Sequence, residues 1–543
     1  MRLPLAFALI LAISPAAAAA GGMAVSVSPP ATDVGGDILK AGGNAVDAAV
    51  AVGFAEAVTW PEAGNIGGGG FMLIHRPNAK PVFIDYREMA PAAATEQMFA
   101  KAVDYQSAKT AGVPGTVRGF ELAHKRFGKL PWKDLVLPAV KLAEEGFAIN
   151  AALVGRLNGA KTARNPEFQR IFGKKGGWKA GDILKQPDLG WSLRQIAEKG
   201  PDAFYTGAIA EKIAAEMKAG EGLITLEDLK NYKAETRTPL TDTYRGYEII
   251  GAPPPSSGGT ALITALNILE LYDLKKNPWM SPETTHLVTE AMRRAFADRA
   301  KYLGDPGFVK VPGNLLSKEH AKELAESIDP AKATASESLT PEIQLSPEKN
   351  ETTHFSIVDA DGMAVANTYT LENSFGCKVV VRGAGFILNN EMTDFNHKPG
   401  VTDRAGSIGT EPNLVAPGKR PLSSMTPTIL LKDGKLALVT GSPGGRTIIN
   451  TVLCVVINYV DYGGDIRAAV DAPRMHHQWF PDRISIEDFP GRALLDGKLK
   501  ALGHTVVTNK QGDAHSIAVD PKTGKLVGAA DKRLDGSAKG WEK

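Results

Sequence analysis

The second half of the chain contains three pairs of strand-like segments, each pair joined by a short turn. The pairs have the sequences THFSIVDADGMAVANTYTL (353–371), PTILLKDGKLALVTGSPGG (427–445) and HSIAVDPKTGKLVGAAD (515–531). Asp361-Gly362 and Asp433-Gly434 stand at the first two turns and are typical of β-hairpins. Hairpins place strands antiparallel, so this half of the chain is expected to form antiparallel sheets.

Helical segments precede and separate these hairpins. Residues 41–58 are alanine-rich and predict a buried helix, residues 131–310 have a mostly helical pattern, and residues 446–463 predict a helix after the second hairpin. The sequence AGFILNNE (384–391) predicts one further strand. Because strands and helices mix in both halves, we expect an α+β fold in which helices cover layered sheets.

The N-terminus, MRLPLAFALILAISPAAAAAGG, has the three parts of a secretory signal peptide. Arg2 precedes an apolar run from Leu3 to Ile13, and Pro15 and small residues follow. This order predicts cleavage after Ala20. The run is shorter than the roughly 20 residues that span a bilayer, which disfavours a membrane anchor. We therefore expect a signal peptide over residues 1–20 and a periplasmic or secreted mature protein.

The charge balance gives little reason to expect a nucleic acid or an anionic membrane as partner. The 543 residues include 62 basic and 60 acidic ones, a formal net charge of +2, whereas such partners call for a basic patch or excess. The two cysteines, Cys377 and Cys454, could pair in an exported protein. Their sequence positions do not show whether they come close enough, and we expect two free thiols.

Several motifs that would indicate particular chemistries are incomplete or missing. The glycine run 67–70 lacks the Lys-Ser/Thr of a phosphate-binding loop and leads into a strand, so close backbone packing is the better interpretation. His476 and His477 are adjacent and have no further ligand at a metal-site spacing, which favours a structural role. No G-x-S-x-G elbow occurs. We expect no metal and no cofactor.

A pair of threonines, Thr352 and Thr353, stands where a polar segment meets the first hairpin. Residues 329–350 are rich in Pro, Ser, Glu and Lys and are interpreted as an exposed, cleavable linker. Threonine is common at strand starts, but a threonine freed at an N-terminus could use its own α-amine as base. The amides of GSPGG (441–445), between a strand and a helix, could form an anion-binding nest. Composition does not choose between the two threonines.

The chain resembles the γ-glutamyltransferases (γ-glutamyltranspeptidases, glutathione hydrolases), a family of N-terminal nucleophile hydrolases. The resemblance extends over essentially the whole mature chain. It rests on these segments in this order: GNIGGGGFMLIH, YREMAP, PPPSSGG, TTHFSIVD, TYTLENSFG, ILNNEMTDF, KRPLSSMTPTI, GSPGGR and APRMHHQW.

The resemblance implies a four-layer αββα sandwich that cleaves itself between Glu351 and Thr352. The products would be a large subunit (21–351) and a small subunit (352–543) that stay together. Thr352 would then attack γ-glutamyl amides such as glutathione. The resulting γ-glutamyl-enzyme would be resolved by water or by the amine of an amino acid or peptide.

The resemblance also assigns roles to individual positions. Thr370 corresponds to a threonine that hydrogen-bonds the nucleophile, and Gly444 and Gly445 correspond to the oxyanion-hole amides. The substrate α-carboxylate and α-ammonium would be bound by the following residues: Arg87, Ser423 and Ser424 for the carboxylate, and Asp394 with Glu391 and Glu372 for the ammonium.

The chain departs from the family pattern at three positions. Glu372 stands where several members have Asn, and Glu391 where some have Gln. Residues 396–419 have the length of a lid loop, but Ala405 stands where such members have a gating aromatic residue. The departures leave the substrate preference of the chain open.

Three other functions remain compatible with the sequence. A cephalosporin or glutaryl acylase and a poly-γ-glutamate depolymerase would use the same scaffold and nucleophile. A periplasmic binding protein with a degenerate site would stay uncleaved. The set Arg87, Ser423, Ser424 and Asp394 favours a free glutamyl head group over a glutaryl group, which has no ammonium.

Overall fold

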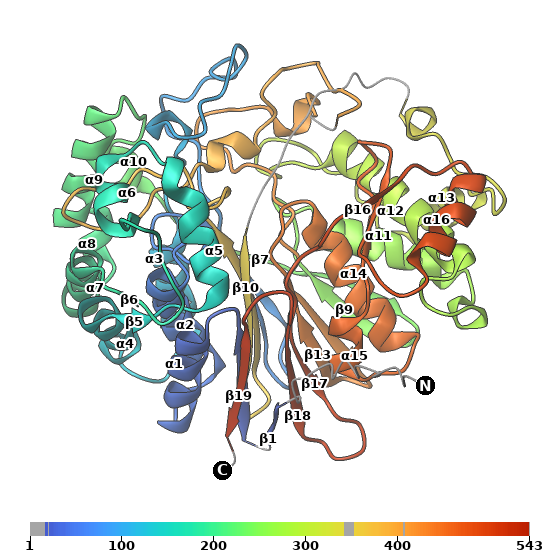
Figure 1. Cartoon of the computed structure of the whole chain (residues 1–543), viewed down its shortest axis with the longest axis horizontal. Coiled ribbons are helices and arrows are strands. Elements are labelled where there is room, and N and C mark those ends of the chain that lie inside the picture. Colours follow the sequence, from blue (N-terminus) through green and yellow to red (C-terminus); the bar gives the residue numbers. More distant parts are fainter. Residues whose placement is uncertain (1–16, 20, 341–351, 406–407, 542–543) are drawn as a thin grey trace, which may run out of the picture.

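A computed structural model describes residues 17–19, 21–340, 352–405 and 408–541. Two seven-stranded antiparallel sheets stack face to face at the centre, and helices cover the outer face of each sheet (Figure 1). This arrangement confirms the expected α+β class and the αββα order of layers. Residues 1–16 and 20, which include most of the expected signal peptide, lie outside the described residues, as does Glu351.

The first sheet carries the strand that begins directly after Thr352. Its strands, in spatial order, are β19 (Ser537–Trp541), β2 (Gly22–Ser26), β10 (Thr353–Val358), β11 (Ala364–Thr370), β3 (Gly69–His75), β4 (Val82–Tyr86) and β7 (Glu235–Arg237). β10 and β11 are the predicted hairpin around Asp361-Gly362, with Thr353 paired to Tyr369.

The second sheet contains the other two predicted hairpins. Its strands, in spatial order, are β1 (Ala17–Ala19), β18 (Leu526–Ala530), β17 (His515–Val519), β13 (Lys435–Thr440), β12 (Thr428–Lys432), β9 (Tyr247–Gly251) and β8 (Leu240–Tyr244). Both sheets therefore combine strands from before and after the Glu351–Thr352 junction.

Apolar side chains fill the space between the sheets. Phe71 and Leu73 of β3 meet Ile429 of β12, Val439 of β13 and Ile517 of β17 in one buried cluster. The strands contribute alternate residues to this layer, because successive side chains in a strand point to opposite faces.

Ten helices cover the outer face of the first sheet. They are α1 (Pro29–Lys40), α2 (Ala45–Thr59), α3 (Thr116–Phe127), α4 (Trp132–Glu145), α5 (Ala151–Gly159), α6 (Pro166–Phe172), α7 (Pro187–Lys199), α8 (Asp202–Tyr205), α9 (Ala208–Ala219) and α10 (Leu226–Asn231). Every residue of α2 is buried, as the alanine-rich segment predicted.

A second group of helices lies over the other sheet. It comprises α11 (Gly258–Glu270), α12 (Pro282–Tyr302), α13 (Lys318–Glu326), α14 (Thr447–Val460), α15 (Ile466–Asp471) and α16 (Arg492–Ala501). Two small sheets are also present: β5 (Phe147–Ala148) with β6 (Ile183–Leu184), and β14 (Met475–His476) with β15 (Ile484–Ile486) and β16 (Val506–Thr508).

The glycine run 67–70 packs backbone against backbone, as predicted. A Cβ atom at Gly68 would lie 2.0 Å from the carbonyl oxygen of Thr370, and one at Gly67 would lie 2.2 Å from that of Ile387. Only glycine allows this approach. The run thereby brings the start of β3 against the end of β11, next to Thr352.

One prediction about strands is wrong, and one hairpin was not predicted. Residues 384–391 form no regular strand but only an isolated bridge between Ile387 and Val380, because Gly383 and Gly385 adopt φ values of 66° and 77° that break the extended chain. The segment 131–310 is mostly helical, as predicted, but it also contains the hairpin β8–β9, turned at Arg245-Gly246. Both turn residues have positive φ, and Arg-Gly is a weaker turn signal than Asn-Gly or Asp-Gly.

The described part of the expected linker, residues 329–340, is mostly exposed, as predicted, but it is held in place at Ser336. Ser336 is buried, its amide donates to Asp482 Oδ2 at 2.8 Å, and its carbonyl accepts from Trp479 Nε1 at 2.8 Å. The remainder, residues 341–350, lies outside the described residues.

Cys377 and Cys454 are both buried and unpaired, which confirms two free thiols. Within the described ranges, no helix is long and apolar enough to cross a membrane.

Candidate active site

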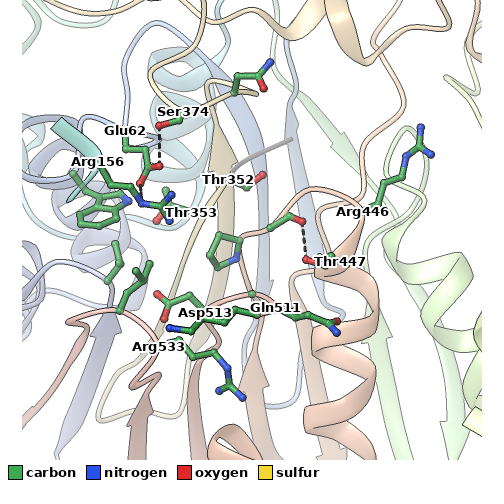
Figure 2. Close-up of a pocket in the computed structure, with 18 of the residues that line it drawn as sticks. Glu62, Arg156, Thr352, Thr353, Ser374, Arg446, Thr447, Gln511, Asp513 and Arg533 are labelled. Atoms are coloured by element: carbon green, nitrogen blue, oxygen red, sulfur yellow. Dashed lines mark hydrogen bonds and ion pairs between the residues drawn. The ribbon is translucent and has the colours of Figure 1, made fainter. Parts of the chain in front are cut away.

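Thr352 lies where two cavities meet, at the start of β10. Its side chain, 8% exposed, lines a small pocket together with the residues expected to bind a glutamyl head group. It also lines a much larger cavity of about 730 Å³ (Figure 2). A hydroxyl at this boundary can reach a ligand that extends from one cavity into the other.

The small pocket brings together nine of the ten residues that were expected to catalyse or bind. They are Arg87, Thr352, Thr370, Glu372, Glu391, Asp394, Ser423, Ser424 and Gly445. The tenth, Gly444, lines the large cavity. These residues come from separate strands and loops, so only the stacking of the two sheets collects them.

The hairpin β10–β11 positions the two threonines of the expected catalytic pair. Thr353 is opposite Tyr369 in the register, which places Thr352 and Thr370 at the same end of the hairpin. Thr370 Oγ1 accepts a hydrogen bond of 2.8 Å from the amide of Glu372, and Glu372 adopts a φ of 78°. The turn after β11 thus directs Glu372 into the pocket beside Thr370.

His354, two residues after Thr352, packs against the glycine loop. Its Nδ1 lies 2.7 Å from Thr368 Oγ1, and a Cβ atom at Gly441 would lie 2.2 Å from its ring. The absence of a side chain at Gly441 therefore lets the loop 441–445 pass close to the start of β10. Burial lowers the pKa of His354 well below its ordinary value, so it is a neutral packing residue.

The loop 441–445 joins β13 to the N-terminal end of α14. Gly444 and Gly445 have φ values of 126° and 57°, which favour glycine. A helix N-terminus favours negative charge, since its first amides have no partner within the helix. The loop is therefore suited to stabilise an oxyanion that forms next to Thr352.

Arg87 is surrounded by acidic groups. Its guanidinium donates through Nη1 to Glu391 and through Nη2 to Asp394. Nε also donates to the carbonyl oxygen of Pro421 at 3.2 Å, and Nη2 to that of Leu422 at 3.3 Å. Arg87 and Asp394 were expected to bind opposite charges of one substrate, and in this structure they bind each other.

The carboxylates outnumber the cations in this pocket. Glu372, Glu391 and Asp394 line it with Arg87, and buried Glu88 lies 3.7 Å from Arg87 Nη1. Burial raises the pKa of Glu372 and of Glu391 well above the ordinary value, and Asp394 adds to both shifts. The excess of acidic groups favours a ligand that carries an ammonium group.

Ser423 and Ser424 line the same pocket. Ser423 Oγ accepts from the amide of Met425 at 3.1 Å. Ser424 Oγ accepts from Arg299 Nη2 at 3.1 Å, and Arg299 Nε donates to Ser257 Oγ at 2.8 Å. Burial lowers the pKa of Arg299 to about 10, so it remains charged at neutral pH and adds positive potential behind the serines.

Sequence reasoning missed Arg299, Glu88 and Tyr105. Arg299 is one of several charged residues in the otherwise buried helix α12, and a charge on a buried face could have been noticed. Glu88 follows Arg87 directly in the YREMAP segment. Tyr105 lines the large cavity, and no sequence pattern pointed to it.

The described residues include one group that could hold a metal ion, formed by His286, Glu290 and His504. His286 Nδ1 lies 2.8 Å from His504 Nε2, and Glu290 is ion-paired to Arg293 and Arg294. The two arginines therefore already neutralise the carboxylate of this group. His476 and His477 bind Asn450 and Asp482, which confirms their structural role.

Glu56 of α2 contacts Thr353, and its burial predicts that the stability of the fold depends on pH. Thr353 Oγ1 donates to its Oε2 at 3.4 Å, and burial raises the pKa of Glu56 from 4.5 to about 8. Between these values the folded chain keeps a proton that the unfolded chain loses, so the free energy of unfolding falls as pH rises. The fall contributed by Glu56 is of the order of a few kcal/mol.

The variant Glu56→Gln tests this prediction when it is made in a Thr352→Ala protein. Thr352→Ala is expected to stay uncleaved with or without Glu56→Gln, so the two proteins compared are both single chains. Urea unfolding at pH 5 and pH 8 should show a smaller loss of stability for Glu56→Gln than for its parent. The other buried carboxylates remain in both proteins, so the difference reports Glu56. An equal loss in both would show that Glu56 is ionised in the fold.

A family model, curated proteins and solved structures all match this chain. The family model for gamma-glutamyltranspeptidase matches residues 31–541. The glutathione hydrolase proenzyme of Escherichia coli (strain K12) is 50% identical over 527 residues, covering 94% of this chain and 90% of that protein. Among solved structures, a cephalosporin acylase from Bacillus halodurans has a TM-score of 0.87 at 29% identity and covers both chains fully. The gamma-glutamyltranspeptidase of Helicobacter pylori has a TM-score of 0.55 at 43% identity, covering 56% of this chain and 91% of that chain.

Proposed function

The chain belongs to the gamma-glutamyltranspeptidase family, and from that premise we propose that it is a self-cleaving γ-glutamyltransferase and glutathione hydrolase. Thr352 is the proposed nucleophile, and glutathione and other γ-glutamyl compounds are the proposed donors. Water and the amines of amino acids or peptides are the proposed acceptors. We also propose export to the periplasm or the medium, on the signal-like sequence of residues 1–20.

The proposed first reaction is cleavage of the chain by its own threonine. Thr352 Oγ attacks the carbonyl carbon of Glu351, and the bond from that carbon to the Thr352 nitrogen breaks. The acyl group is then held as an ester on Oγ until water hydrolyses it, which leaves a carboxylate on Glu351 and a free amine on Thr352. The word proenzyme in the name of the Escherichia coli relative supports such processing. Shared sheets would hold segments 21–351 and 352–543 together after the cut.

The free amine of Thr352 then acts as the base for the second reaction. Its reference pKa of about 7.7–8.0 lets it take the Oγ proton at neutral pH. Oγ attacks the γ-carbonyl of the donor, and Gly444 and Gly445 stabilise the oxyanion. The amine passes the proton to the leaving nitrogen as the amide bond breaks. Water or an acceptor amine attacks the γ-glutamyl ester and restores Thr352.

The pairing of Arg87 with Asp394 is the observation that best supports a donor with a free glutamyl head group. An amino acid head group has one carboxylate and one ammonium, so it can exchange the Arg87–Asp394 pair for two new pairs of opposite charge. The small pocket has a free volume of only about 10 Å³, and binding therefore requires these two side chains to separate. A glutaryl group would leave Asp394 and its neighbouring acids without a cation, which is costly for buried charges.

The strongest alternative function is that of an acylase, because the similar Bacillus halodurans structure is a cephalosporin acylase. Comparing two donors distinguishes the two functions. Wild-type protein should hydrolyse γ-glutamyl-p-nitroanilide far faster than glutaryl-7-aminocephalosporanic acid. Release of p-nitroaniline and chromatography of the cephalosporin nucleus measure the two rates. Preference for the glutaryl compound would assign acylase activity instead.

A further inference from the structure

The large cavity beside Thr352 is placed to receive whatever lies beyond the γ-carbonyl of a donor. Figure 2 shows Thr352 between Arg156 and Glu62 on one side and Arg446 and Thr447, at the start of α14, on the other. The small pocket, which Thr352 also lines, already accounts for the glutamyl head group. Given the proposed function, the leaving group and the incoming acceptor must therefore occupy the large cavity.

Basic side chains dominate the lining of this cavity. Six cationic residues line it, namely Arg156, Lys378, Arg446, Arg483, Lys510 and Arg533. Two carboxylates, Glu62 and Asp513, face the same space. The chain as a whole is nearly neutral, with a formal charge of +2, so the positive potential is a local property of this cavity.

Some of these cations are compensated by acidic neighbours. Arg156 Nε lies 3.1 Å from Glu62 Oε2, and Arg533 pairs with Glu487 and with Asp531. Asp513 lies 2.8 Å from His515. Glu62 is thus paired with a cation of the lining, and Asp513 lies beside the buried His515.

Three cations of the lining have no such partner in the described part of the chain. Lys378, Arg483 and Lys510 form no ion pair and no side-chain hydrogen bond with any described residue. Arg483 and Lys510 are exposed and Lys378 is partly buried, and no described carboxylate forms an ion pair with any of the three.

Lys378 lies in the turn after β11 and has a φ of 57°. Asn373, Ser374 and Gly376 of the same turn line the large cavity, and Glu372 lines the small pocket. The turn that carries Lys378 therefore borders both cavities.

We propose that Lys378, Arg483 and Lys510 make the large cavity selective for peptide leaving groups and acceptors that carry carboxylates. This proposal rests on the proposed function, because that function places the leaving amine and the acceptor amine in the large cavity. A carboxylate on the peptide supplies the counter-charge that the cavity lacks, and the attraction weakens with ionic strength.

A matched pair of donors tests the proposal. Glutathione and its glycine carboxamide differ only in the terminal carboxylate of the leaving group. Wild-type protein should show a kcat/KM for glutathione about tenfold or more above that for the carboxamide at low salt, where opposite charges attract most strongly. In Lys378→Met with Lys510→Met the ratio should fall toward 1, and Lys378→Arg with Lys510→Arg should keep it. Added NaCl should lower the ratio in the wild type.

The control variant is Lys40→Met at the end of α1, an exposed lysine that lines neither cavity. It should keep the wild-type ratio. A wild-type ratio near 1, or a ratio unchanged in the double Met variant, would overturn the proposal while leaving the proposed function intact. If the wild-type protein did not turn over γ-glutamyl-p-nitroanilide at all, both the proposed function and the proposed selectivity of the cavity would be overturned. Appearance of two chain fragments in each variant verifies that it folds.

Discussion

Replacing Thr352 by alanine is expected to leave one uncut chain and to lower γ-glutamyl transfer by at least about 10⁴-fold. Alanine has no hydroxyl to attack the Glu351 carbonyl, so neither the chain cleavage nor the γ-glutamyl ester can form. Mass spectrometry of the intact protein should find one species in the variant and two fragments in the wild type. N-terminal sequencing of the smaller wild-type fragment should begin at Thr352.

The neighbouring threonine provides the matched control. Thr353 lies one residue further into β10, and its hydroxyl contacts Glu56 at 3.4 Å rather than the small pocket. Thr353→Val should therefore still cleave before residue 352, and Thr352→Ser should cleave because it keeps a hydroxyl. Normal cleavage in Thr352→Ala would refute the assignment of the nucleophile, and cleavage lost only in Thr353→Val would move that assignment to Thr353.

Replacing Asp394 by asparagine is expected to lower kcat/KM for γ-glutamyl donors by about 10²–10³-fold, mainly through KM. The substitution removes the negative charge proposed to receive the substrate ammonium, and a buried charge pair that loses one partner costs about 3–4 kcal/mol. Self-cleavage should continue, because the peptide bond before Thr352 presents no free α-ammonium. Initial rates with γ-glutamyl-p-nitroanilide, and the fragment pattern of the same sample, measure both properties.

Asp433→Asn is a control with the same chemical change at an exposed turn. Asp433 stands between β12 and β13 with a φ of 50°, a conformation that asparagine tolerates. Its kcat/KM should match that of the wild type. Unchanged kinetics in Asp394→Asn would exclude a role in binding the ammonium. An equal loss of self-cleavage and turnover would show that Asp394 supports the fold rather than the head group.

Local patterns predicted most of the sheets and helices. The hairpins β10–β11, β12–β13 and β17–β18 and the helices α2, α12 and α14 appear where alternation, turn residues and apolar composition placed them. These signals depend on residues close together in the chain. The hairpin β8–β9 was missed because its turn residues, Arg245-Gly246, give a weak signal inside a helical region. The expected strand at 384–391 failed because two glycines with positive φ fold that segment back on itself.

The sequence by itself determined the α+β class and most of the hairpins and helices, and through the family resemblance it gave the layer order, the candidate nucleophile and the identity of the residues around it. Only the tertiary structure decided how those residues meet. Arg87 binds Glu391 and Asp394, which are 304 and 307 positions away in the chain, and no local pattern encodes such a contact. The same holds for the charge of the large cavity, since its cations come from distant loops and a helix. Stacking of the two sheets brings these segments together, because burying their apolar faces also fixes the loops at their edge.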